Sequence, residues 1–166
     1  MRRDWIGSAV LLVVLALLIV RPWEGDATAG PAASGARVTR VVDGDTFEAR
    51  VGGGIEDVRL IGIDTPETVK PGSPIQCYGP KASHFTHRLL EGRTVRIVLG
   101  VERRDVYDRL LAYVHLGHRF VNAILVRRGL ARTLTIPPND RYAPLLRRLE
   151  IRAARAGRGL WGVCRP

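Results

Sequence analysis

Residues 42–67 read VDGDTFEARVGGGIEDVRLIGIDTPE, and this stretch carries the clearest strand pattern in the chain. Apolar and charged side chains alternate over residues 47–51, with the two-residue period of a half-buried β-strand. The glycines at 52–54 then turn the chain, and residues 58–63 predict a second strand that is apolar on both faces except for Arg59. The stretch therefore predicts a pair of strands with carboxylates at their ends.

Outward from this hairpin, the chain alternates between strand and helix patterns. Further strands are expected near residues 95–99, 110–116 and 120. Three helices are expected: one from Pro80 to just before Gly92, one over residues 121–128, and a long one ending near Ala156 that Asn139 or Asp140 caps. Strands followed by mixed helices and strands predict an α+β domain with a small closed or nearly closed sheet.

The N-terminal region precedes this domain and has a different composition. Residues 5–20 (WIGSAVLLVVLALLIV) carry no charge, and as a helix they would span ~24 Å, somewhat less than a ~30 Å hydrocarbon core. Arg2 and Arg3 favour a cytoplasmic N-terminus. The alternative is a signal peptide cleaved near residues 27–29 (ATA). We therefore predict a transmembrane anchor or signal sequence over 1–23, a flexible tether over 24–36, and a folded domain over 37–166 outside the cytoplasm, at the cell membrane or secreted.

The folded region is strongly basic and contains both cysteines. The chain has 26 basic and 16 acidic side chains, for a net charge of +10, and all its basic residues except Lys70 and Lys81 are arginines. Such a surface favours a polyanionic partner, nucleic acid or anionic lipid, although a merely solvated arginine surface is the alternative. Cys77 and Cys164 permit one intramolecular disulfide, which an exported protein can keep, or two free thiols.

Four clusters supply the groups that phosphodiester cleavage requires. They are Asp43-Gly44-Asp45-Thr46, Arg59, Asp64-Thr65-Pro66-Glu67 and Asp105-x-Tyr107-x-Arg109. Cleavage needs a metal to hold phosphate and water, a group that acts on the water, and cations that meet developing charge.

The acidic residues of these clusters predict a metal site. Asp43 and Asp45, read as strand residues two apart, would point the same way, and Asp64 would end the next strand beside Asp45. Two carboxylates and a carbonyl form an all-oxygen site that suits Ca²⁺ rather than Zn²⁺. Taken singly, each cluster has a structural alternative: Asp-Gly-Asp is a common turn, and Arg59 could pair with a nearby acid.

The order of these clusters resembles that of the staphylococcal nuclease (thermonuclease) family. The resemblance rests on residues 42–46 (VDGDT), 58–68 (VRLIGIDTPET), 78–83 (YGPKAS) and 105–113 (DVYDRLLAY), and is extended by 121–122, 125–127 and 129–131. It implies an OB-fold, a five-stranded β-barrel with three α-helices, here preceded by the N-terminal hydrophobic helix. It also implies hydrolysis of DNA and RNA with Ca²⁺ as the cofactor.

The resemblance assigns a role to each matching residue. Asp45 and Asp64 would be carboxylate ligands of Ca²⁺, the main chain of Thr65 a carbonyl ligand, and Asp43 a nearby acid. In the same way, Glu67 would orient or deprotonate the attacking water, Arg59 and Arg109 would clamp the scissile phosphate, and Tyr107 would touch a terminal phosphate. The expected products carry 3′-phosphate ends.

Two departures from the family pattern concern substrate contacts rather than the hydrolytic residues. Val106 stands where the prototype has a lysine, and residues 135–137 (TIP) lack its two aromatic side chains. Stacking on an aromatic ring contributes ~1–3 kcal/mol per base, so base preference is expected to differ. A monomer is expected. The competing hypotheses are a non-catalytic OB-fold module that binds nucleic acid, and a structural protein that uses its arginines on a membrane surface.

Overall fold

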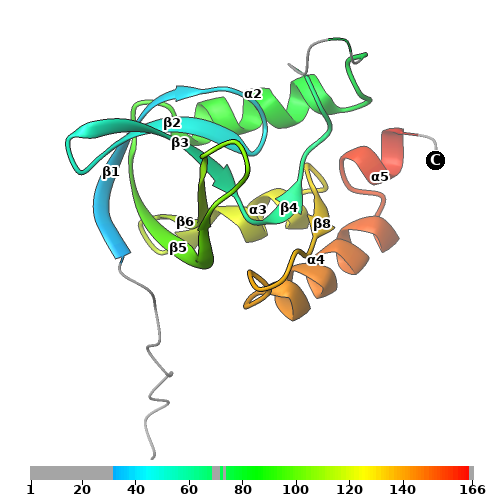
Figure 1. The fold of residues 1–166 in the computed structure, drawn as a ribbon. Coiled ribbons are helices and arrows are strands. Elements are labelled where there is room, and N and C mark those ends of the chain that lie inside the picture. The colour runs from blue at the N-terminus through cyan, green and yellow to red at the C-terminus, as the bar shows by residue number, and fades with distance from the viewer. Residues whose placement is uncertain (1–31, 69–71, 73, 165–166) are drawn as a thin grey trace, which may run out of the picture.

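The computed structural model describes residues 32–68, 72 and 74–164, and its centre is a five-stranded β-barrel (Figure 1). The barrel strands are β1 (Ala32–Val41), β2 (Thr46–Val51), β3 (Gly54–Leu60), β5 (Thr94–Arg104) and β6 (Leu110–Leu116), with the two-residue β7 (Arg119–Phe120) continuing the sheet beyond β6. β1 pairs antiparallel with β2 and β5, β2 with β3, and β5 with β6. A parallel pairing of β3 with β6 closes the barrel. The α+β class and the five-stranded barrel expected from the sequence are therefore present.

The alternation over residues 47–51 produces a strand with one face in the core, as predicted. Phe47 and Ala49 are fully buried inside the barrel, whereas Arg50 between the strand's apolar positions is exposed. Val58 and Leu60 face the same core from β3. Burial of these side chains on a closed sheet fixes the start of β2, which follows Asp45, and the end of β3, which carries Arg59.

The predicted second strand over 58–63 is not continuous. β3 ends at Leu60, and β4 (Gly62–Asp64) leaves the barrel to pair antiparallel with β8 (Arg132–Leu134), a strand that the sequence analysis did not predict. Gly62 causes the break: its φ is +79°, and a Cβ there would lie 2.7 Å from Cδ1 of Leu146. Only glycine adopts this backbone conformation without strain, so the change of direction at Gly62 places Asp64 at the end of a separate strand.

A buried asparagine fixes this change of direction. Asn122 is fully buried and donates its side-chain amide to the carbonyl of Ile61 (2.9 Å), while it accepts from the N–H of Val114 (3.0 Å). These bonds tie the end of β3 to β6 and to α3. A buried amide that is satisfied on both sides resists displacement, because breaking either bond leaves a desolvated polar group.

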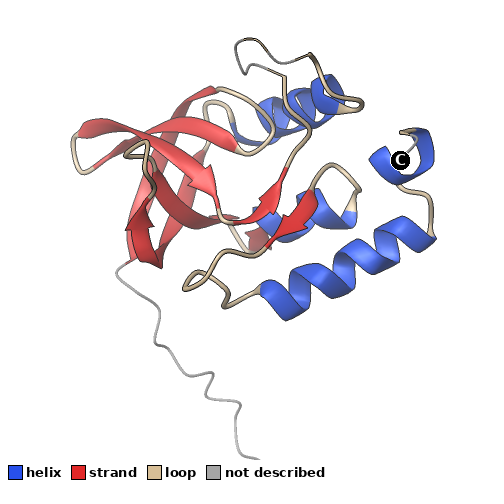
Figure 2. Cartoon of the chain, turned by 45° about the vertical axis from the view of Figure 1, so that its right-hand side comes forward, coloured by secondary structure: helices blue, strands red, loops and turns tan. Residues whose placement is uncertain are grey.

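The helices lie together on one side of the barrel, as Figures 1 and 2 show from two directions. They are α2 (Gly79–Leu90), α3 (Val121–Arg127), α4 (Ala143–Arg155) and the short α5 (Leu160–Val163). The first three are those predicted, and Pro80 occupies the first turn of α2 as expected. α5 was not predicted.

The predicted cap of the long helix is wrong. α4 begins at Ala143, its N-cap is Tyr142, and no side chain caps it. Asn139 is instead used in a tertiary contact, where its amide donates to the carbonyl of Glu102 (2.9 Å) and accepts from the N–H of Glu102 (3.2 Å). The competing bonds to β5 remove Asn139 from the helix, and the chain forms turns before α4 starts.

The N-terminal predictions lie mostly outside the described residues. Residues 1–31, which include the hydrophobic segment 5–20, are not described, and β1 already begins at Ala32, inside the expected tether. In the part of the chain that the structure describes, no helix is long and apolar enough to cross a membrane.

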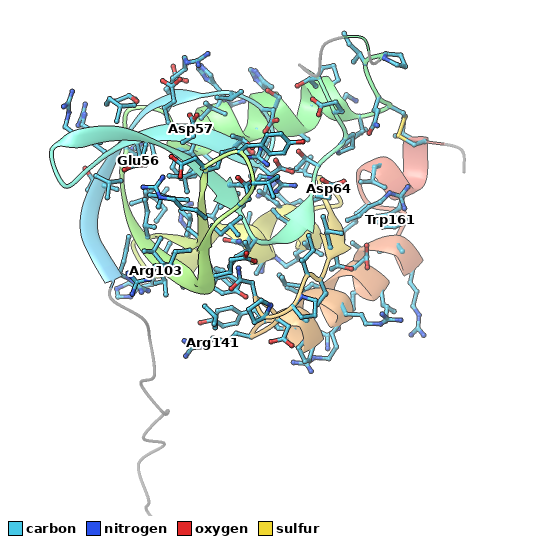
Figure 3. The ribbon with its side chains drawn as sticks, viewed as in Figure 1. Glu56, Asp57, Asp64, Arg103, Arg141 and Trp161 are labelled. Carbon is cyan, nitrogen blue, oxygen red and sulfur yellow. A yellow bond between two sulfur atoms is a disulfide. The ribbon has the colours of Figure 1, made fainter. Side chains whose placement is uncertain are left out.

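Cys77 and Cys164 are joined in the structure, with their Cα atoms 5.8 Å apart and a sequence separation of 87 (Figure 3). The pair links the chain just before α2 to the end of α5. A cross-link over so long a loop stabilises a fold by about 4–5 kcal/mol in the chain-entropy model. Its formation in the natural protein stays a prediction, because it requires an oxidising compartment.

Candidate active site

A guanidinium group from β3 joins the two predicted carboxylate ligands. Nη1 of Arg59 lies 3.2 Å from Oδ2 of Asp45, and its Nη2 lies 2.9 Å from Oδ1 of Asp64. Nη1 also donates to the carbonyls of Leu60 (2.8 Å) and Ile63 (3.0 Å), on either side of the break at residue 62. Arg59 is thus held by the backbone as well as by both acids, and the predicted grouping of these three side chains is present.

Arg59 does not use the acids nearest to it in sequence. Figure 3 shows Glu56 and Asp57 in the barrel strands, away from Asp64. Glu56 pairs with Arg104 at 2.9 Å. The structural alternative for Arg59, an ion pair with Glu56 or Asp57, is therefore not the one that the fold adopts: its ion pairs are with Asp45 and Asp64.

Asp45 is the buried member of the group, with 4% of its surface exposed. Its Oδ2 accepts hydrogen bonds from the backbone N–H (2.6 Å) and the hydroxyl (2.9 Å) of Thr65. Thr46 donates its hydroxyl to Oδ1 at 3.2 Å. These bonds compensate for the removal of the carboxylate from water and connect the β1–β2 turn to the end of β4.

Asp43 and Asp45 lie in the bend between β1 and β2, not on a strand as predicted, because β2 begins at Thr46. The side chain of Asp43 accepts the N–H of Asp45 (3.0 Å), a local bond that stabilises turns. The pKa of Asp43 is raised to about 6, first by burial and then by the negative charge of Asp45, while the hydrogen bond from the N–H of Asp45 and the charge of Arg59 act in the opposite direction. The bend therefore concentrates more negative charge than one guanidinium neutralises.

The donors fit a hard cation in their chemistry. Carboxylate, hydroxyl and main-chain oxygens are the ligands that Ca²⁺ and Mg²⁺ prefer. The described residues contain no group of three or more His, Cys, Asp or Glu side chains arranged to hold a metal ion. The predicted set has only two carboxylates, Asp45 and Asp64, and both contact Arg59. A cation held by them would therefore compete with the guanidinium.

Glu67 lies beyond β4, on the chain that leads to α2. Its carboxylate accepts the N–H of Thr68 at 2.8 Å, and its own N–H donates to the side chain of Gln76 at 3.0 Å. The bond to Thr68 uses one carboxylate oxygen, and a carboxylate can accept further hydrogen bonds, including one from water.

Arg109, just before β6, is held by an acid to which the sequence analysis gave no role. Oδ2 of Asp105 lies 2.8 Å from its Nε and 2.7 Å from its Nη2. Burial alone would raise the pKa of Asp105, but hydrogen bonds from the side chain and N–H of Arg109 and from the N–H of Tyr107 outweigh it and hold that pKa below its ordinary value. The signal for this role was the Asp-x-x-x-Arg spacing, which lets a short turn fold back on itself.

The two guanidinium groups share one pocket. Arg59 and Arg109 both line a cavity of about 330 Å³, whose other walls include Leu134 and Ile136. Tyr107 is 77% exposed and lies beneath Arg109, with 5.2 Å between its ring centre and the guanidinium carbon. The pocket, which Glu102 and Asp105 also line, therefore offers two guanidinium groups to an anion and aliphatic side chains to an apolar group attached to it.

Gly44 is a second residue whose role the sequence analysis missed. A Cβ at this position would lie 2.6 Å from the hydroxyl of Thr65. The carbonyl of Gly44 accepts a hydrogen bond from the buried hydroxyl of Thr86 in α2 at 2.7 Å. The absence of a side chain lets the bend approach Thr65 closely enough for Asp45 to accept its two hydrogen bonds.

Comparison with known proteins gives consistent matches. The sequence pattern of a family described as "Staphylococcal nuclease homologue" matches residues 57–163. A protein named thermonuclease from Staphylococcus intermedius is 39% identical over 97% of this chain and 99% of its own length. A thermonuclease from Staphylococcus hyicus is 37% identical over 91% of this chain and 95% of its own length. The SPbeta prophage-derived endonuclease YokF of Bacillus subtilis is 37% identical over 74% of this chain and 42% of its own length.

Replacing Gly44 by alanine should disturb the site through Thr65. The added methyl group overlaps the Thr65 side chain, and we expect a loss of about 1–3 kcal/mol in the free energy of unfolding. Urea denaturation measures it. Gly54→Ala is the matched control, because a Cβ there meets nothing nearer than 4.0 Å. Equal stabilities of the two variants would contradict the role given to Gly44.

Proposed function

The chain belongs to the staphylococcal nuclease family, and from this premise we propose that it is a Ca²⁺-dependent nuclease that hydrolyses the phosphodiester bonds of DNA and RNA. Relatives that match most of its length are named thermonucleases, which supports a nuclease function. The observation that carries the proposal is the contact of Arg59 with both Asp45 and Asp64, beside a pocket that Arg59 shares with Arg109.

The two arginines would act on the scissile phosphate. A guanidinium offers paired donors that match phosphate oxygens, and preorganised cations stabilise the charge that develops on those oxygens in the transition state. Asp105 keeps Arg109 oriented before substrate arrives. Arg59 has donors to two carbonyls that do not depend on the acids, so it remains in place when a phosphate or a cation takes over its contacts with Asp45 and Asp64.

Ca²⁺, held by Asp45, Asp64 and the carbonyl of Thr65, would position the phosphate and the attacking water and neutralise charge. The chain's own contribution is to hold those oxygens together. The bonds from Thr65 fix Asp45, while Asp64 stays accessible at 56% of its side-chain surface. Asp43 adds negative charge near Asp45, and this charge favours the binding of a metal cation there.

Glu67 would orient or deprotonate the water. A carboxylate is suited to this task because it accepts a proton or a hydrogen bond from water at neutral pH. Glu67 lies on the segment that follows Asp64 and Thr65, and its carboxylate accepts a hydrogen bond from the N–H of Thr68 there.

Products with 3′-phosphate ends complete the proposal. Exposed Tyr107 would contact a terminal phosphate. The pocket wall beyond it is made by aliphatic side chains, Val106, Leu134 and Ile136, rather than aromatic rings. Aliphatic surfaces lack the ~1–3 kcal/mol per base of stacking on a ring, so substrate affinity and base preference should differ from those of a nuclease with aromatic side chains there.

We further propose that the enzyme acts outside the cytoplasm as a monomer. It would be held at the membrane through residues 5–20, or released by cleavage of a signal sequence. The uncharged N-terminal segment and the cysteine pair support this placement.

The full-length chain should digest single- and double-stranded DNA and RNA when Ca²⁺ is present and stop when a chelator removes it. End-group analysis should find phosphate at the 3′ ends. Digestion that continues in excess chelator would contradict the proposed cofactor, and 5′-phosphate ends would contradict the proposed bond. The absence of any digestion would favour a non-catalytic binding module.

Replacement of Glu67 by Gln or Arg109 by Ala should lower turnover by about a hundredfold or more, because each removes a group used in the transition state. Arg50→Ala is the control, since Arg50 is equally charged, exposed and on β2 away from the pocket. Rates on DNA at saturating Ca²⁺ make the comparison. A Glu67→Gln enzyme as fast as Arg50→Ala would remove Glu67 from the mechanism.

A further inference from the structure

A second strongly basic surface lies between the helices. A groove of about 1140 Å³ is bounded by α2, by the end of α3 and by the loop between α4 and α5. Figures 1 and 2 show these elements on the helical side of the barrel. None of its lining residues belongs to the pocket that holds Arg59 and Arg109. We call this surface the helical groove.

Five cationic side chains from three elements line the helical groove: Lys81, Arg88, Arg127, Arg128 and Arg158. All five are exposed. No Asp or Glu lines the groove, and none of the five makes an ion pair with a carboxylate of the described residues. Arg40 and Arg104, on the barrel strands, do have acidic partners. The groove therefore concentrates positive charge that no ion pair among the described residues neutralises.

Contacts with aromatic rings hold two of these cations in place. The Arg128 guanidinium lies 4.9 Å from the ring centre of Phe85, and the Lys81 ammonium lies 5.1 Å from that of Tyr78. Arg158 donates to the carbonyl of Arg127 at 3.4 Å, which brings the α4–α5 loop against the end of α3. Such contacts lower the entropy that a flexible cation loses when it binds an anion.

We propose that the helical groove is a second binding site for nucleic acid, which takes the phosphodiester backbone of a strand whose distant part lies in the active site. The choice of ligand rests on the proposed nuclease function. The groove is larger than the roughly 300–1,000 Å³ of ordinary small-molecule pockets, and it is open, so it suits a segment of a polymer rather than a single nucleotide. A second contact on the same strand raises affinity for long substrates without any change at the scissile bond.

The proposal predicts a length-dependent and salt-dependent effect. For single strands the slope of log affinity against log salt is about −0.7 for each phosphate contact. Loss of four contacts should therefore reduce the slope by about 3. A short substrate that fills only the active site should be indifferent to the groove.

The test compares two fourfold variants of the full-length chain. The groove variant is R88Q/R127Q/R128Q/R158Q, and the matched control is R147Q/R148Q/R152Q/R155Q, which removes the same charge from exposed positions of α4 outside the groove. Fluorescence anisotropy measures binding of a labelled single strand of about 40 nucleotides in excess chelator over a salt series. We expect the groove variant to bind at least about tenfold more weakly, with the slope reduced by about 3. The decrease in log affinity of the control should be less than half of the decrease in the groove variant.

Charge-keeping lysine replacements at the same four positions should restore most of the affinity. If the fourfold groove variant does not fold, Arg88→Gln with Arg158→Gln tests two walls of the groove, with an expected loss of about 1.4 in slope. Unchanged slope and affinity in the groove variant, or an equal loss in the α4 control, would overturn the proposal. So would a groove variant that loses binding to phosphatidylserine vesicles but retains the oligonucleotide.

A hydrolysis arm separates this proposal from the proposed function. With Ca²⁺, groove variant and native chain should cleave a trinucleotide at equal rates, while the groove variant should show a KM for the long strand raised about tenfold. If the native chain cleaves neither substrate, the nuclease proposal fails, and the binding measurements in chelator still decide the helical groove.

Discussion

The contact of one guanidinium with two carboxylates is the constraint on which the site depends. Arg59 can reach both Asp45 and Asp64 only because β3 ends where the chain turns at Gly62, and because its donors also engage the carbonyls of Leu60 and Ile63. Without the acids, a charged side chain in a mostly apolar strand would be costly to bury. The barrel, the break after β3 and the buried Asn122 all help to hold these groups in their relative positions.

Hydrophobic alternation predicted the strand over residues 47–51, and the order of elements predicted an α+β domain with a small closed or nearly closed sheet. The five-stranded barrel and the roles of Arg59 and the acids were predicted from the resemblance to the nuclease family, because their motifs follow one another in the same order. The sequence could not predict features set by contacts distant in sequence. The chain at Gly62 lies close to Leu146, where a Cβ would not fit, and the start of α4 depends on the bonds between Asn139 and Glu102. β8 has only three residues, too few for a periodic signal.

The two surfaces of the protein differ in how acidic and basic side chains are arranged on them. At the active site, acids and arginines are interleaved, so a phosphate and a cation can each find partners there. The helical groove is lined by Arg88, Arg127 and Arg158 and, among the described residues, by no Asp or Glu. Such a surface suits the binding of a phosphate backbone without hydrolysis. This division explains why a net charge of +10 is compatible with a site rich in carboxylates.

Calorimetric titration of Ca²⁺ into the full-length chain without nucleic acid tests the shared carboxylates most directly. The account predicts one site in the native chain, affinity at least about tenfold weaker in Asp45→Asn, and severalfold tighter binding in Arg59→Gln, because the guanidinium no longer competes for the ligands. Absence of Ca²⁺ binding to the native chain, or an Asp45→Asn chain that binds as the native one does, would contradict it.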